Sequence, residues 1–113
     1  DLRSMPDLTL TEPFGYLDFL CLMDRARVVL TDSGGIQEET TVLGVPCLTV
    51  RPNTERPITI THGTNRLVRP EEVGAAVREL VANPPVPPAE PPPLWDGHAG
   101  ERIAAILRDA IPG

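Results

Sequence analysis

The sequence predicts an α/β fold with a Rossmann-like parallel sheet, because short apolar segments alternate with segments of helical periodicity. The apolar segments are four or so residues long, are rich in β-branched residues and are bounded by helices, which is typical of strands buried on both faces of a parallel sheet. Strands that alternate with helices also imply right-handed crossovers. In such sheets ligands bind beyond the carboxyl ends of the strands. Polar residues that follow a strand are therefore candidates for a functional site.

The first part of the chain contains two predicted strands and the helix between them. Residues 8–10 form a short strand candidate, which Pro13 and Gly15 end. Residues 16–26 have a helical pattern, and residues 28–31 form a short apolar strand. One face of this first helix carries Leu17, Leu20 and Met23.

The second part of the chain continues the alternation of helices and strands. Residues 35–43 are predicted to form a helix, and the following GVP sequence is a helix stop. Residues 47–50 and 65–68 are predicted strands, separated by the polar loop RPNTERP. Proline opens the next helix at a first-turn position, with two glutamates near its positive end, and the helix runs to about residue 82.

Composition divides the chain into three segments. Residues 1–82 form the predicted Rossmann-like domain, residues 83–95 a proline-rich linker and residues 96–113 a C-terminal helix. Seven of the ten residues in 84–93 are proline, which excludes a helix there and favours a semi-rigid spacer over an SH3-type ligand. Asp96 is the expected N-cap of the last helix. The apolar stripe of that helix comprises Ile103, Ile106, Leu107 and Ala110.

Charge and composition exclude several classes of protein. The 113 residues carry a formal net charge of −6 and no basic stripe, which argues against nucleic-acid binding. No stretch reaches the roughly 18 to 20 apolar residues of a membrane span, and no signal peptide opens the chain. Cys21 and Cys47 are expected to be buried free thiols in a reducing compartment, so we expect a cytoplasmic protein without membrane association. Because the chain begins at Asp1, we expect a processed product or a piece of a longer protein.

The sequence LTDSGGIQEET contains the strongest candidate for a binding site. A helix that begins near Ser33 exposes unpaired backbone N–H groups and a partial positive charge. Gly34 and Gly35 remove the β-carbons that would keep an anion away, and the Ser33 hydroxyl adds another possible donor. Together these residues predict a phosphate cradle. The alternative is a capped helix whose glycines serve only the turn geometry.

Acidic and basic residues near this helix extend the candidate site. Glu39 lies one turn beyond Gly35 on the same face, where a carboxylate could accept hydrogen bonds from a ribose diol, whereas Glu38 is expected to be solvated. The alternative is a solvated Glu39, and helical periodicity alone does not decide between the two. In the RPNTERP loop an arginine could clamp a diphosphate bidentately, although a salt bridge between Glu55 and an arginine explains the loop equally well.

Residues for metal binding or hydrolysis are not evident in the sequence. His62 and His98 are isolated from other metal-ligating residues, and no serine–histidine–acid set stands out. We therefore expect neither a metal nor a cofactor nor a hydrolytic triad in this chain.

Four sequence blocks together resemble a known family. EPFGYLDFLCLM, LTDSGGIQEET, LGVPCLTVRPNTERP and GTNRLV, in this order and spacing, closely resemble the C-terminal half of non-hydrolysing UDP-N-acetylglucosamine 2-epimerases. The similarity covers roughly residues 8–82 and resumes at WDGHAGERI. It implies a GT-B-type fold of two Rossmann-like domains, of which this chain supplies part of the second, UDP-binding domain without its first strands. An exposed sheet edge would then make the isolated piece poorly stable.

The resemblance also implies roles for individual residues. Ser33, Gly34 and Gly35 would bind the diphosphate, and Glu39 the ribose hydroxyls. Phe19 would pack near the uridine, the backbone at Phe14 would read the uracil edge, and Arg56 would contact the nucleotide sugar.

The family reaction interconverts UDP-N-acetylglucosamine and UDP-N-acetylmannosamine by inversion at C2, through elimination and re-addition of UDP. Its catalytic carboxylates and histidine belong to the N-terminal domain and to the region before Asp1, so the chain alone is expected to be inactive. The implied partners are UDP or the UDP-sugar, the N-terminal domain of the same enzyme and, in the full-length protein, a second copy in a homodimer.

Two departures from the family pattern keep alternatives open. Relatives commonly carry a helical connection and an N-P-Y-G-D-G-like motif before the last helix, whereas this chain has the proline spacer and Leu94-Trp95. The alternatives are the nucleotide-sugar domain of a GT-B glycosyltransferase and a non-catalytic remnant.

Overall fold

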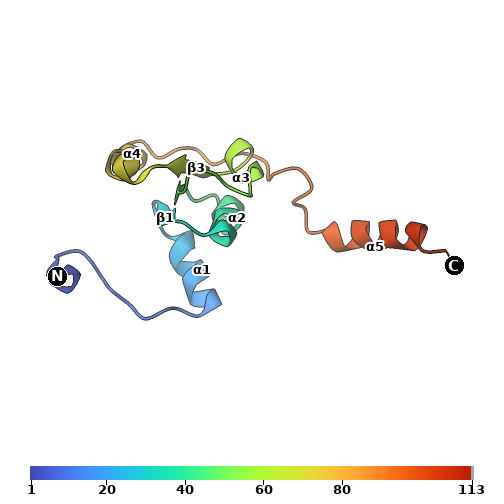
Figure 1. Cartoon of the computed structure of the whole chain (residues 1–113), viewed down its shortest axis with the longest axis horizontal. Coiled ribbons are helices and arrows are strands. Elements are labelled where there is room, and N and C mark those ends of the chain that lie inside the picture. The colour runs from blue at the N-terminus through green and yellow to red at the C-terminus, as the bar shows by residue number, and fades with distance from the viewer. Residues whose placement is uncertain (113) are drawn as a thin grey trace.

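The structure is a computed structural model that describes residues 1–112, and its centre is a three-stranded parallel sheet (Figure 1). The strands are β1 (Val29–Thr31), β2 (Cys47–Val50) and β3 (Asn65–Val68), in the spatial order β1-β2-β3. Cys47 lies opposite Val29 on one side and opposite Asn65 on the other. The predicted α/β fold with a parallel sheet is therefore confirmed, with β1 and β3 as its two edges.

The helices follow the predicted order with small shifts at their ends. The four longer helices are α1 (Tyr16–Asp24), α2 (Gly34–Leu43), α4 (Val73–Ala82) and α5 (Ala99–Ala110). The shorter ones are α3 (Ile58–Thr61) and two 3₁₀ helices, η1 (Leu2–Ser4) and η2 (Pro70–Glu72). Gly44 ends α2 in the left-handed conformation, with a φ of 74°, as expected for a glycine C-cap. No helix in residues 1–112 is long and apolar enough to cross a membrane.

The two faces of the sheet are packed in different ways. On the α4 face, Leu48, Val68 and Ala76 form a small apolar core, with further valines and Leu80 around it. On the opposite face α2 contacts β2 and β3, and the buried side chains there include Gln37 and Asn65. Side-chain alternation along each strand separates the apolar face from the polar one.

Two predictions about the first 65 residues were wrong, and one helix was not predicted. Residues 8–10 form no strand, because the segment that contains them runs apart from the sheet and has no strand to pair with (Figure 1). The chain between β2 and β3 contains the helix α3, where no helix was expected. Cys21 is exposed because α1 turns that side of its helix to solvent, whereas Cys47 is buried as predicted. Both cysteines are free thiols.

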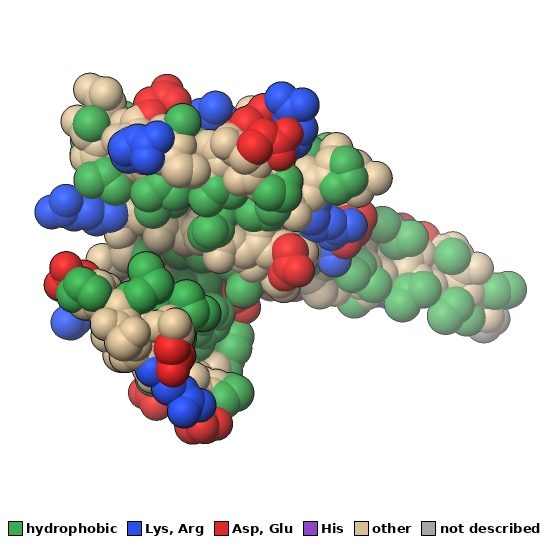
Figure 2. All heavy atoms as spheres, turned by 60° about the vertical axis from the view of Figure 1, so that its left-hand side comes forward, with side chains coloured by type: hydrophobic (Ala, Val, Ile, Leu, Met, Phe, Trp, Pro, Cys, Tyr) green, Lys and Arg blue, Asp and Glu red, His purple; other side chains and the backbone are tan. Residues whose placement is uncertain are grey.

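The proline-rich segment is extended and ends in α5, which projects away from the sheet (Figure 1). This arrangement gives the described chain extents of 65 × 29 × 25 Å. Helix α5 has no buried residue, and the apolar side chains of its stripe are exposed along the projecting arm in Figure 2. Residue 113, the last of the predicted C-terminal segment, lies outside the described residues.

The start of α5 differs from the prediction. Its N-cap is His98 and not Asp96. The Asp96 carboxylate instead accepts a hydrogen bond from the His98 backbone N–H at 2.9 Å and pairs with Arg102. These contacts hold the pKa of Asp96 at about 2, with the Arg102 hydrogen bonds as the largest cause. Asp96 thus fixes the turn that leads into the helix.

Candidate functional site

The candidate site lies where β1 ends and α2 begins, at the carboxyl end of a parallel strand. Ser33 is the N-cap of α2, with extended backbone angles, and its side chain makes no capping hydrogen bond. Its backbone N–H donates to the Thr31 hydroxyl at 3.0 Å. The first N–H groups of α2 therefore lack a side-chain cap, and the end of a helix in this state attracts anions.

The two glycines at this helix end serve different purposes. A β-carbon at Gly35 would meet no atom within 4 Å, so open space lies beside this residue. A β-carbon at Gly34 would lie 3.2 Å from a carboxylate oxygen of Glu55. Gly34 thus lets the loop after β2 approach the helix, while Gly35 faces open space that a ligand could occupy.

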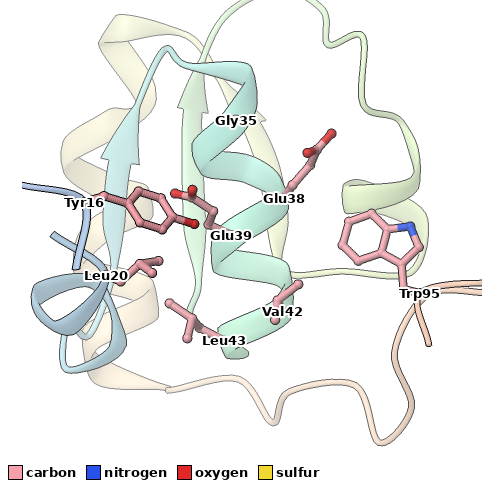
Figure 3. Close-up of a pocket in the computed structure, with 8 residues that line it drawn as sticks. All are labelled: Tyr16, Leu20, Gly35, Glu38, Glu39, Val42, Leu43 and Trp95. Atoms are coloured by element: carbon pink, nitrogen blue, oxygen red, sulfur yellow. The ribbon is translucent and has the colours of Figure 1, made fainter. Parts of the chain in front are cut away.

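A pocket of about 580 Å³ extends from Gly35 along the exposed side of α2 (Figure 3). In this view the side chains of Glu39 and Tyr16 face each other on one side of the helix, and Trp95 lies on the other side. The Glu39 charge is the main cause that raises the pKa of the Tyr16 hydroxyl. The pocket is lined by Tyr16, Leu20, Gly35, Glu38, Glu39, Val42, Leu43 and Trp95.

Two ion pairs place the arginines of the loop after β2. Arg51 pairs with Glu55 at 2.9 Å, and its hydrogen bond is the largest cause that lowers the pKa of Glu55. This is the salt bridge that the sequence left open as an alternative. Arg56 pairs with Glu38 of α2, so the prediction that Glu38 is simply solvated was wrong. The pair brings the Arg56 guanidinium to the helix that begins at Ser33.

Phe14 and Phe19 lie in a different pocket. They line a hollow of about 480 Å³ beside the start of α1, together with residues of the preceding segment. The structure thus places the seven predicted site residues in two neighbouring groups. Ser33, Gly34, Gly35 and Glu39 lie in the first turns of α2, and Arg56 is joined to this group through Glu38, whose side chain points away from Glu39 in Figure 3.

A buried polar network beneath the site was missed in the sequence. Gln37 is fully buried and Asn65 is 5% exposed, and the two side-chain amides are joined by a hydrogen bond of 3.0 Å. Both residues occupy positions that the periodicity of α2 and β3 turns toward the core. A polar residue at a core-facing position was the signal that could have revealed them.

A metal site is not present among residues 1–112. No group of three or more histidine, cysteine, aspartate or glutamate side chains in that range is arranged to hold a metal ion.

Comparisons with known proteins identify relatives of the chain. A family model described as UDP-N-acetylglucosamine 2-epimerase matches residues 1–108. The UDP-N-acetylglucosamine 2-epimerase of Methanocaldococcus jannaschii is 45% identical over 108 residues, which are 94% of this chain and 29% of that protein. The enzyme of the same name from Escherichia coli K12 is 40% identical over 114 residues, covering 96% of this chain and 30% of the relative.

Solved structures show the same relationship. The M. jannaschii UDP-GlcNAc 2-epimerase in complex with UDP-GlcNAc and UDP matches with a TM-score of 0.75 and 41% identity. The Neisseria meningitidis UDP-GlcNAc 2-epimerase bound to UDP-GlcNAc matches with a TM-score of 0.82 and 35% identity. Each match covers 96% of this chain and 30% of the solved chain. The chain therefore spans about 30% of the length of these relatives.

Proposed function

Because the chain belongs to the UDP-N-acetylglucosamine 2-epimerase family, we propose that it is the UDP-binding part of an epimerase. The complete enzyme would interconvert UDP-N-acetylglucosamine and UDP-N-acetylmannosamine. The relatives named above are called epimerases, which favours this function over a glycosyltransferase domain. Two of the solved relatives are bound to UDP-GlcNAc, one of them also to UDP, which supports a nucleotide sugar as the ligand.

The observation that carries the proposal is the uncapped start of α2, with Glu39 one turn further along the same helix. Backbone N–H groups and the Ser33 hydroxyl would hold the diphosphate, and open space beside Gly35 would admit it. The Glu39 carboxylate would accept hydrogen bonds from the ribose hydroxyls. Arg56 reaches α2 through Glu38, from where its guanidinium could turn to the diphosphate or the sugar.

In this proposal the second pocket would hold the base of the nucleotide. Phe14 and Phe19 line it, next to the first turns of α1. An aromatic side chain there would pack against uridine, and backbone groups at Phe14 would contact the uracil edge.

This part of the enzyme would assist the reaction by stabilising charge on the leaving group. Negative charge builds on the diphosphate as the bond between C1 of the sugar and the UDP oxygen breaks. Fixed N–H donors at the start of α2 would stabilise that charge without reorganising. The groups that move protons at the sugar would belong to the part of the complete enzyme that this chain does not cover. The chain alone would therefore bind UDP without epimerising a UDP-sugar.

The remaining expectations about organisation belong to the same proposal. Residues 1–82 would form the nucleotide-binding domain, residues 83–95 a linker and residues 96–113 a helix for contact with the rest of the enzyme, which would act as a homodimer. The two free thiols fit the reducing cytoplasm.

Isothermal titration of the chain with UDP tests the proposal. We expect binding by the unmodified chain, and a loss of about tenfold or more in affinity for Glu39→Ala and for Ser33→Ala, because each removes hydrogen bonds to a charged or polar ligand. Glu79→Ala is the control, because Glu79 is an exposed acid on α4, across the sheet from the site. Equal affinities for all four proteins, or no binding by an unmodified chain that circular dichroism shows to be folded, would show the site assignment to be wrong.

A further inference from the structure

The backbone of Arg56 is held on both sides by threonine side chains, of which Thr59 is fully buried and Thr54 half-buried. The Arg56 N–H donates to the Thr54 hydroxyl at 2.9 Å, and the Arg56 carbonyl accepts from the Thr59 hydroxyl at 2.7 Å. The side chain of Arg56, in contrast, is 41% exposed and reaches α2. A long, flexible side chain thus starts from a backbone position that is fixed at its amide and at its carbonyl.

Both hydroxyls are in turn tied to the Gln37–Asn65 pair. Thr54 donates to the Gln37 side-chain oxygen at 2.6 Å, and Asn65 donates from its side-chain nitrogen to the Thr59 hydroxyl at 3.1 Å. The same Asn65 nitrogen donates to Gln37, so its two hydrogens are both used. The network therefore closes a ring from Arg56 through α2 and β3 and back to Arg56.

The network is anchored to the elements that form the site. The Gln37 side-chain nitrogen donates to the Ser33 carbonyl at 3.2 Å, at the start of α2. The Asn65 oxygen accepts from Thr49 of β2 at 2.6 Å. Thr49 and Thr59 are both fully buried, so water does not compete for these bonds. Gln37 thus links the backbone of Arg56 to Ser33, because its side chain bonds both the Thr54 hydroxyl and the Ser33 carbonyl.

We propose that the Gln37–Asn65 network, with Thr54 and Thr59 as its arms, positions Arg56 for binding of the nucleotide diphosphate at Ser33. This inference rests on the proposed function. None of the four side chains needs to touch the ligand, so they are positioning residues. The network fixes the backbone position from which the Arg56 guanidinium would reach the pyrophosphate at the helix end, and bidentate contacts depend strongly on that placement.

The test uses Thr59→Val, which keeps the shape of the side chain and removes the hydroxyl that holds the Arg56 carbonyl. Thr40→Val is the matched control, because Thr40 is equally buried and its hydroxyl donates to carbonyls of its own helix, at Ile36 and Gln37, and not to the Arg56 backbone. Thr59→Val also removes the acceptor of the Asn65 side-chain nitrogen, but only the bond to the carbonyl holds Arg56 directly. Loss of that one neutral hydrogen bond corresponds to a change of about three- to tenfold. We expect the dissociation constant for UDP to rise by about that factor in Thr59→Val and to stay unchanged in Thr40→Val.

A double-mutant cycle separates positioning from a general structural effect. In an Arg56→Ala background, Thr59→Val should have no further effect on UDP affinity, because the residue that it positions is gone. An equal effect in both backgrounds would overturn the inference. The inference would also be overturned if Arg56→Ala weakens UDP binding but Thr59→Val binds UDP as tightly as Thr40→Val does.

A second variant gives a readout that needs no ligand. Thr54→Val removes the acceptor of the Arg56 N–H, so hydrogen exchange at that amide, followed by NMR, should be roughly tenfold faster than in Thr40→Val. Unchanged exchange would refute the ring of hydrogen bonds itself. If the unmodified chain binds no UDP, the proposed function fails, and the role of the network in binding fails with it. Binding by the unmodified chain without coupling between Thr59 and Arg56 overturns only the inference.

Discussion

Gly63 is the position where a single added methyl group should damage the fold most clearly. A β-carbon there would lie 2.5 Å from the Thr59 carbonyl oxygen, 2.5 Å from the Thr41 hydroxyl oxygen and 2.7 Å from the Thr41 methyl carbon. These distances are well below van der Waals contact, so α2, α3 or the turn before β3 must move. Overpacking of this kind typically costs about 1–3 kcal/mol of unfolding free energy. For a domain of this size each kcal/mol lowers the melting temperature by roughly 4–8 °C.

The measurement is thermal and urea unfolding of Gly63→Ala followed by circular dichroism. Gly100→Ala is the control, because a β-carbon at Gly100 meets no atom within 4 Å. The variant Gly63→Ala/Thr41→Ala adds a sharper test. It removes both clashing Thr41 atoms but leaves the backbone oxygen of Thr59, so it should restore only part of the lost stability. An unfolding midpoint for Gly63→Ala equal to that of the unmodified chain would refute the packing described around α3.

Two further predictions concern titratable groups. Asp96 has its pKa lowered to about 2 in the folded chain from an ordinary value of 3.8, so its contacts stabilise the start of α5 at pH values above 3.8 and are lost as the pH falls toward 2. The helical signal of α5 in circular dichroism should decrease over that pH interval. In Asp96→Asn the signal should be lower at neutral pH and should show no such transition. An unchanged signal in Asp96→Asn would contradict the role of the Arg102 pair. Tyr16 is the only tyrosine, so absorbance at alkaline pH reports its ionisation alone. Because the Glu39 charge raises the Tyr16 pKa, Glu39→Gln should let Tyr16 ionise at lower pH; an identical titration curve would show that the two side chains do not interact.

The strands and helices that the sequence predicted correctly are those with a strong local signal. The run before Asp32 and the run after Pro46 are short, apolar and β-branched, and they form β1 and β2 as expected. The end of α2 was predicted correctly from Gly44, because a left-handed backbone conformation at that position favours glycine. Residues 8–10 have the same local appearance as a strand, but a strand forms only where a neighbour offers hydrogen bonds.

The start of α2 at the candidate site was predictable from the sequence, but the buried polar residues beneath it were not. A serine and two glycines between a strand and a helix indicate a helix end open to an anion, and the structure has that geometry. For Gln37 and Asn65 the only signal was a polar residue at a core-facing position. That signal is weak, because glutamine and asparagine are mostly surface residues and their burial depends on partners up to 28 residues away. The helix α3 was missed for a related reason, since its sequence ITIT is rich in β-branched residues, which favour strands.

The polar face of the sheet has a consequence for how the chain finds its native alignment. Apolar surfaces tolerate a shifted neighbouring strand at moderate cost. A slip of β3 by one residue, in contrast, would bring Arg66 to the place of Asn65 and remove the hydrogen bonds that Asn65 makes to Gln37, Thr49 and Thr59. Misaligned strands would therefore be penalised as soon as water is expelled from this layer. The buried polar groups of this small sheet thus disfavour incorrect pairing of strands that are far apart along the chain.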